Sequence, residues 1–303
     1  MQYAYYPGCS LSATGLEYRT SIAMVCQHLG VELKEIDDWN CCGASTAHLT
    51  DHYLSLALPA RNLALAEKQI EADIAVPCAA CFARMKKAVQ EVRDNPQIKE
   101  EIGEIIEMDY QAKYDVYSFL DILADEKWQE KIKRLVKKPL ENLPVACYYG
   151  CLLVRPANIA QSDDPEYPMG MDKLIGLLGG KAVDWDFKTE CCGASHAVAK
   201  QKVGLEMIYQ ILHNAQVNGA KAIATACPLC MINLDMRQKS INKKYGTNFH
   251  FPIYYFTELM AASFGDDLQK IGLPKHFVEA LTPIQSAWRG EIAFGNQKGG
   301  EQR

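Results

Sequence analysis

Ten of the twelve cysteines in this 303-residue chain fall into two groups that share one internal order. Each group has a single cysteine, then an adjacent pair followed by glycine, and then a Cys-x-x-Cys motif. The first group has 31 and 35 intervening residues and the second has 39 and 34. Cysteines that only fill a core would not recur in register, so the pattern indicates two sites built from thiolates. The groups are Cys9, Cys41, Cys42, Cys78 and Cys81, and then Cys151, Cys191, Cys192, Cys227 and Cys230.

The number of thiols in each group favours a polynuclear iron centre over zinc. A structural zinc site is closed by four ligands, so five cysteines would leave one unused in each copy. The side chains of adjacent cysteines such as Cys41 and Cys42 point away from each other, so they more readily bind two different metal atoms than the same metal atom. Soft thiolates bind both zinc and iron-sulfur clusters, so ligand type alone leaves a zinc-stabilised interaction module open.

The sequence around the Cys-x-x-Cys motifs suits thiolate formation. Cys78 and Cys81 stand between an expected strand and an expected helix, and the positive end of that helix would lower the pKa of both thiols. Cys227 and Cys230 repeat this arrangement, with Pro228 at a position typical of a first helical turn.

Two cysteines lie outside the repeated pattern. Cys26 falls on the apolar side of an expected helix, and Cys147 precedes the better-aligned Cys151 by four residues. Buried free cysteines commonly act as small apolar residues, so we expect both to belong to the core.

The elements that position these cysteines are duplicated as well. Four motifs of the first half return in the second half in the same order. The pairs are Tyr5-Tyr6-Pro7-Gly8-Cys9 with Tyr148-Tyr149-Gly150-Cys151, Cys41-Cys42-Gly43-Ala44-Ser45 with Cys191-Cys192-Gly193-Ala194-Ser195, Cys78-Ala79-Ala80-Cys81 with Cys227-Pro228-Leu229-Cys230, and Val116-Tyr117-Ser118-Phe119-Leu120-Asp121 with Ile253-Tyr254-Tyr255-Phe256-Thr257-Glu258.

Short apolar runs alternate with amphipathic stretches in both halves, which predicts an α/β fold with mostly parallel sheets flanked by helices. Strands are expected at residues 3–6, 31–36, 74–76, 145–149, 181–185 and 222–225. Helices are expected at residues 14–29, 51–72, 171–178 and 200–218. Thr14 and Glu17 match a capping box, and Gly30 matches a helix stop.

The duplication predicts two domains, residues 1–142 and residues 143–303, joined by a charged stretch that ends near Pro139. The second domain is expected to end in a polar tail around Gly295 to Gly300, where apolar periodicity is absent.

Composition restricts the partners. The net charge of −5 gives no reason to expect nucleic acid. No apolar run approaches the roughly 20 residues that a spanning helix needs, so we expect no direct membrane span. The first residues lack the features of a secretory signal, which predicts a cytoplasmic protein.

At these motifs the chain resembles the cysteine-rich, or CCG, domain family, and its two tandem copies resemble the B subunit of heterodisulfide reductase. The resemblance covers almost the whole chain. It implies that each group of five cysteines binds one non-cubane [4Fe-4S] cluster, and that the chain is part of an oxidoreductase that acts on a small disulfide or thiol. It also implies an iron-sulfur partner similar to the C subunit of that enzyme and, through that partner, a flavin protein similar to its A subunit.

The resemblance leaves two functions open. The clusters would act on a disulfide or thiol directly, or they would relay electrons within a sulfur-oxidising, electron-bifurcating or quinone-linked succinate or fumarate complex. The chain has neither a GxGxxG opening nor the closely spaced cysteine run of a ferredoxin, so a partner must supply its electrons in either case.

Overall fold

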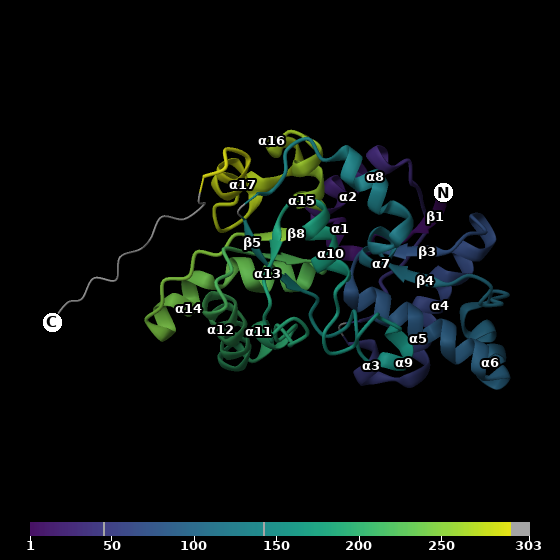
Figure 1. The fold of residues 1–303 in the computed structure, drawn as a ribbon. Helices are drawn as coiled ribbons and strands as arrows, with labels where there is room; N and C mark the ends of the chain where they lie inside the picture. Colours follow the sequence, from purple (N-terminus) through teal and green to yellow (C-terminus); the bar gives the residue numbers. More distant parts are fainter. Residues whose placement is uncertain (45, 142, 292–303) are drawn as a thin grey trace.

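A computed structural model describes residues 1–44, 46–141 and 143–291 of the chain. The expected domain boundary at residue 142 and the expected polar tail lie outside these residues. In the text below, the first half is the part before residue 142 and the second half is the part after it. In Figure 1 most of the first half, purple through blue to teal, lies on the right, and most of the second half, teal to yellow, lies on the left, while α9 (Ala157–Ala160) of the second half lies on the right near α5 (Ala79–Asp94).

Each half contains one four-stranded sheet in which every neighbouring pair is parallel. The strand orders, β2-β1-β3-β4 and β6-β5-β7-β8, are the same topology written twice. This confirms the α/β prediction with two related parallel sheets. The strands are β1 (Gln2–Tyr5), β2 (Glu32–Glu35), β3 (Ile74–Val76), β4 (Val116–Ser118), β5 (Pro144–Tyr148), β6 (Lys181–Ala182), β7 (Ala222–Thr225) and β8 (Ile253–Tyr255).

Helices connect the strands and flank both sheets (Figure 1). The first half contains α1 (Gly8–Leu11), α2 (Leu16–Leu29), α3 (Ala47–Thr50), α4 (His52–Gln69), α5 (Ala79–Asp94), α6 (Pro96–Ile106), α7 (Phe119–Ala124), the 3-10 turn η1 (Glu126–Trp128) and α8 (Gln129–Leu135). The second half contains α9 (Ala157–Ala160), α10 (Gly170–Leu177), α11 (His196–Ala199), α12 (Gln201–Val217), α13 (Pro228–Met236), α14 (Gln238–Tyr245), α15 (Phe256–Phe264), α16 (Leu268–Ile271), η2 (Leu273–Lys275) and α17 (Leu281–Trp288).

The structure corrects three details of the predicted elements. The capping box at Thr14 is wrong: α2 begins at Leu16 with Gly15 as its N-cap and no side-chain cap. The sequence did not predict α1, whose Ser10 carbonyl accepts the Gly15 N–H at 2.8 Å and so sets the entry into α2. The strand expected at residues 181–185 ends at Ala182, because the chain turns there and carries Trp185 under the sheet to donate to the Cys147 carbonyl at 3.2 Å.

The two halves pack together through two equivalent helix pairs, α2 on α15 and α10 on α7 (Figure 1). In the first pair, the rings of Tyr18 and Tyr255 stack with centroids 4.0 Å apart. The hydroxyls of Ser21 and Thr257 lie 2.7 Å apart in the same buried contact. The cores of the halves are therefore continuous across the interface.

Among the described residues, none of the helices combines the length and the apolarity that crossing a membrane requires.

Candidate metal centres

The repeated cysteines follow the carboxyl ends of the strands in both sheets. Cys9 lies in α1 just after β1, and Cys78 is the N-cap of α5 just after β3. In the second half Cys151 follows β5, and Cys227 is the N-cap of α13 just after β7. Because parallel strands end at a common edge, the topology gathers these residues from distant parts of the sequence.

The first group of five converges. The Sγ atoms of Cys42 and Cys81 lie 3.1 Å apart in the interior. The thiol of Cys9 hydrogen-bonds with that of Cys41, and the thiol of Cys78 with that of Cys81. Sulfur contacts thus join Cys42, Cys81 and Cys78, and the Cys9–Cys41 pair lies near enough for the charge of Cys42 to act on Cys9.

The second group repeats this arrangement. The Sγ atoms of Cys192 and Cys230 lie 3.5 Å apart. The thiol of Cys151 hydrogen-bonds with that of Cys191, and the thiol of Cys227 with that of Cys230. Both groups predicted from the sequence are therefore brought together.

The two groups also touch each other, which the sequence analysis did not anticipate. The thiols of Cys78 and Cys227, the helix N-caps of the two halves, hydrogen-bond across the interface. Six sulfurs accordingly form one connected row, in which the first Cys-x-x-Cys motif faces the second. The pairs Cys9–Cys41 and Cys151–Cys191 lie near this row, and the ten sulfurs together are called the sulfur band below. The only sequence signal for this contact is the equivalence of the two cysteines in the duplication.

Sulfur contacts shift the thiol pKa values in opposite directions within each pair. Hydrogen bonding from Cys81 lowers the pKa of Cys42 to about 7, while the same contact raises the pKa of Cys81. Hydrogen bonding from Cys151 likewise lowers the pKa of Cys191 to about 6. One sulfur of each pair is thus set up as thiolate while its neighbour keeps the proton, because adjacent buried negative charges repel. Full deprotonation of such a site requires a bound cationic centre.

Glycine makes room for sulfur at the same place in both halves. Gly8 and Gly150 both have φ of +68°. A Cβ at Gly8 would lie 3.3 Å from Cys81 Sγ, and a Cβ at Gly150 would lie 3.1 Å from Cys230 Sγ. These glycines therefore let the loop of the single cysteine close over the Cys-x-x-Cys motif.

A buried tyrosine fixes each Cys-Cys loop. The Tyr6 hydroxyl donates to the Asn40 carbonyl at 2.9 Å, and the Tyr148 hydroxyl donates to the Glu190 carbonyl at 2.6 Å. Both acceptors immediately precede a cysteine pair. The sequence motifs pair Tyr148 with Tyr5, whereas the structure makes it the counterpart of Tyr6, with no gap before the glycine.

Exposure differs along the band of sulfurs. Cys9 and Cys41 are exposed and Cys151 and Cys191 are half-buried, while the other six repeated cysteines are buried. The centres therefore have a solvent-facing edge and a protected interior edge. Cys26 and Cys147 are buried in the core, as expected.

The donor set suits a polynuclear group better than a single ion. The thiols lie in contacting pairs spread over five positions per half. Soft, partly buried thiolates arranged in this way fit an iron-sulfur cluster.

The duplicated parallel α/β halves and their thiol bands define a class of tandem cysteine-rich domain proteins. The family model described as "CCG: Cysteine-rich domain" matches residues 3–86 and 145–235. The chain belongs to this CCG cysteine-rich domain family.

Known relatives match nearly the full chain. It is 31% identical to the 8-methylmenaquinol:fumarate reductase membrane anchor subunit of Wolinella succinogenes, over 92% of this chain and 98% of that one. It is 29% identical to the B subunit of the ferredoxin:CoB-CoM heterodisulfide reductase of Methanosarcina mazei, over 93% and 94%. It is 27% identical to a protein of Archaeoglobus profundus described as similar to the B subunit of heterodisulfide reductase, over 89% and 93%. These similarities support an iron-sulfur subunit of a redox complex.

A solved structure shares the fold. A hypothetical protein from Helicobacter pylori superposes with a TM-score of 0.74 at 13% identity, over 93% of this chain and 52% of that one. At that identity the likeness describes architecture alone.

Proposed function

We propose that the ten repeated cysteines hold two non-cubane [4Fe-4S] clusters, five thiolates for each, and that the chain carries out thiol-disulfide redox chemistry within a larger complex. The contact between Cys78 and Cys227 is the observation that carries this proposal. Two electrons must be exchanged when a disulfide is cleaved or formed, and two centres that meet can each handle one.

The five-thiol composition of each site supports the cluster type. A cubane [4Fe-4S] cluster is satisfied by four cysteines, whereas each half supplies five linked thiols. A bound cluster would supply one-electron redox chemistry and iron atoms with affinity for sulfur. The chain would hold the thiolates in place through its helix N-termini, and its Tyr6 and Tyr148 hydroxyls would keep the Cys-Cys loops in register.

The partners of this proposal are an iron-sulfur protein similar to the C subunit of heterodisulfide reductase and, through it, a flavin protein similar to the A subunit. The exposed edge formed by Cys9 and Cys41 suits electron entry, because transfer rates require a short path to a partner. A cytoplasmic location belongs to the same proposal.

A second candidate is an electron-relay subunit of a quinone-linked fumarate or succinate complex. It is favoured by the similarity to the protein of Wolinella succinogenes named as the membrane anchor of 8-methylmenaquinol:fumarate reductase. In this case the two centres would transfer electrons between partner proteins, and no thiol or disulfide substrate would bind to them.

The decisive experiment is anaerobic purification followed by measurement of iron, zinc and acid-labile sulfide, and then by electron paramagnetic resonance with thiols or disulfides added. We expect about eight iron and eight sulfide per chain, with spectra that change when a small thiol is added. Zinc without sulfide would overturn the cluster proposal. A full iron content with spectra indifferent to every thiol and disulfide would instead select the electron relay.

A further inference from the structure

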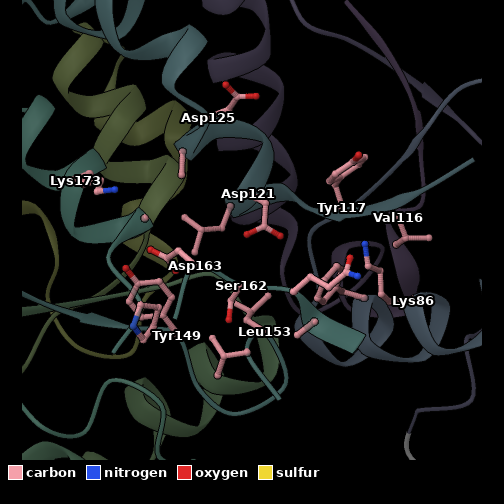
Figure 2. Close-up of a pocket in the computed structure, with 18 residues that line it drawn as sticks. Lys86, Val116, Tyr117, Asp121, Asp125, Tyr149, Leu153, Ser162, Asp163 and Lys173 are labelled. Carbon is pink, nitrogen blue, oxygen red and sulfur yellow. The ribbon is translucent and has the colours of Figure 1, made fainter. Parts of the chain in front are cut away.

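A cavity of about 290 Å³ lies between the halves, and its lining residues include none of the ten repeated cysteines (Figure 2). The first half contributes α5, β4 and α7 to its walls, and the second half contributes Tyr149, the segment between Cys151 and α10, and the first turn of α10. Carboxylates and lysines line it together with apolar side chains. Neither proposed cluster site accounts for this cavity.

The wall from the second half is an insertion. The gap between the single cysteine and the cysteine pair is 39 residues in the second half and 31 in the first, a difference of eight. The extra length lies in the segment that includes α9, which packs on α5 of the first half. Ala160 and Ser162 of this segment face the cavity.

Asp121 is the acid that the first half presents to the cavity. It is the third residue of α7, and the Ser118 N-cap donates to its carboxyl. Glu258 occupies the equivalent position in α15 and accepts the Tyr255 N–H at 2.8 Å. The two acids therefore come from one ancestral position and cap their helices in the same way.

The second half covers its acid with a cation. His276 Nε2 lies 3.0 Å from Glu258 Oε1, and these side chains are only 2% and 0% exposed. The nearby pocket of about 300 Å³ is lined by His276, and Glu258 is not among its lining residues. Burial by itself would lower the pKa of His276, but the negative charge of Glu258 raises it to about 9. An imidazolium thus occupies the site over Glu258.

The first half leaves the equivalent acid open. The side chain of Asp121 is exposed and its carboxylate is directed into the cavity (Figure 2). Among the described residues, none of the lysine, arginine or histidine groups forms an ion pair with Asp121. The Lys86 ammonium lies over the Tyr117 ring, 5.5 Å from its centroid, and its charge acts on the Asp121 carboxyl from there. Surrounding protein atoms still exclude much of the water, and this desolvation raises the pKa of the Asp121 carboxyl.

Two further polar groups, the Asp163 carboxylate and the Ser162 hydroxyl, line the cavity. Asp163 is close enough for its charge to act on Asp121, and its carboxylate accepts the Met169 N–H at 2.9 Å. The Ser162 hydroxyl oxygen is buried, and it has no hydrogen-bond partner among the residues that the structure describes. Phe82 and Leu153 provide apolar surface beside these polar groups.

We propose that this cavity binds a small molecule through a primary ammonium group, which occupies the place over Asp121 that His276 occupies over Glu258. The carboxylates of Asp121 and Asp163 and the hydroxyl of Ser162 receive the ammonium, and the apolar wall receives its carbon stem. The ligand is therefore an aliphatic or arylalkyl amine, with Lys86 and Lys173 at the rim available to an anionic substituent.

Ligand-observed saturation-transfer NMR on the full chain, purified anaerobically, tests this proposal with three probes of one shape: benzylammonium, benzyl alcohol and benzoate. We expect benzylammonium to bind about tenfold more tightly than benzyl alcohol, and benzoate to bind most weakly. Asp121→Asn should remove the preference for benzylammonium. Lys86→Gln removes a nearby competing cation and should strengthen benzylammonium binding about twofold.

Glu104→Gln in α6, an exposed acid that does not line the cavity, is the matched control and should leave all three affinities unchanged. Equal affinity for the three probes, or a benzylammonium affinity that survives Asp121→Asn, would overturn the proposal. Lys86→Gln guards against a folding artefact, because misfolding cannot strengthen binding. The measurement needs no redox activity, so its result does not depend on the cluster proposal.

Discussion

The two halves keep the same sulfur chemistry and differ in what surrounds it. Each brings five thiols to the carboxyl edge of a parallel sheet, closes a glycine loop over its Cys-x-x-Cys motif and fixes the cysteine pair with a tyrosine. At the two equivalent interfaces, however, Asp121 opens into a cavity and Glu258 is covered by His276. The duplication has thus preserved the arrangement of the thiols, while the surroundings of the equivalent acids Asp121 and Glu258 differ.

The loops that precede the cysteine pairs show the same divergence. In the second half Lys188 is buried and pairs with Asp172 at 2.8 Å, and its carbonyl accepts the N–H groups of Tyr149 and Gly150. The first half has Asp38 at the same distance before its cysteine pair, where it is exposed and pairs with Arg61. In the described part of the chain, a buried ion pair therefore stabilises the loop of the second centre but not that of the first.

The largest expected effect is the loss of iron and sulfide from one centre while the other centre keeps its own. We predict that Cys42→Ala and Cys192→Ala each lower the iron and sulfide content by about half, because each removes an inner thiolate from one five-thiol site. Cys26→Ala, which alters a buried cysteine outside the repeats, should retain the full content. Anaerobic iron and sulfide analysis measures all three. Complete loss from either single variant would mean that the sites form one indivisible centre.

The buried pair of Lys188 and the exposed pair of Asp38, which lie in the equivalent loops of the two halves, should differ greatly in their effect on the free energy of unfolding. Lys188→Met leaves Asp172 buried without its cation and should lower the free energy of unfolding by roughly 3–5 kcal/mol. Asp38→Asn, which breaks the exposed pair with Arg61, should cost less than about 1 kcal/mol. Urea denaturation of both variants provides the comparison. Similar losses for the two variants would show that burial of the Lys188 pair does not increase its contribution to the free energy of unfolding.

The covered acid of the second half predicts a specific pH dependence. Because the pKa of His276 is raised from 6.5 to about 9 in the fold, its contribution of roughly 3 kcal/mol is fully present below pH 6.5 and is lost as the pH rises through 9. Denaturation midpoints measured between pH 6 and 10 should fall over that window. In His276→Gln this fall should be absent, and its persistence would assign it to another group.

The sequence was sufficient for the repeat, the α/β class and the grouping of the cysteines, because strand periodicity and cysteine spacing are local properties. It could not predict the contact between Cys78 and Cys227, since that contact depends on how the two halves pack. The role of His276 was hidden for the same reason: it lies 18 residues after Glu258 in a segment with no counterpart in the first half. One feature of the sequence does correspond to the cavity: the spacing between the single cysteine and the cysteine pair is eight residues longer in the second half. That this longer segment forms a cavity wall follows only from the packing of α9 on α5.

The smallest expected effect concerns the open acid itself. Asp121→Asn should change the free energy of unfolding by no more than about 0.5 kcal/mol, because the side chain is exposed and an amide oxygen can still accept the Ser118 N–H. Glu258→Gln should cost roughly 2 kcal/mol or more, since it leaves the buried His276 without its counter-charge. Thermal denaturation of both variants at pH 7 tests the pair. A large loss for Asp121→Asn would mean that this carboxylate is needed by the fold, and an acid needed by the fold would not be free to receive a ligand.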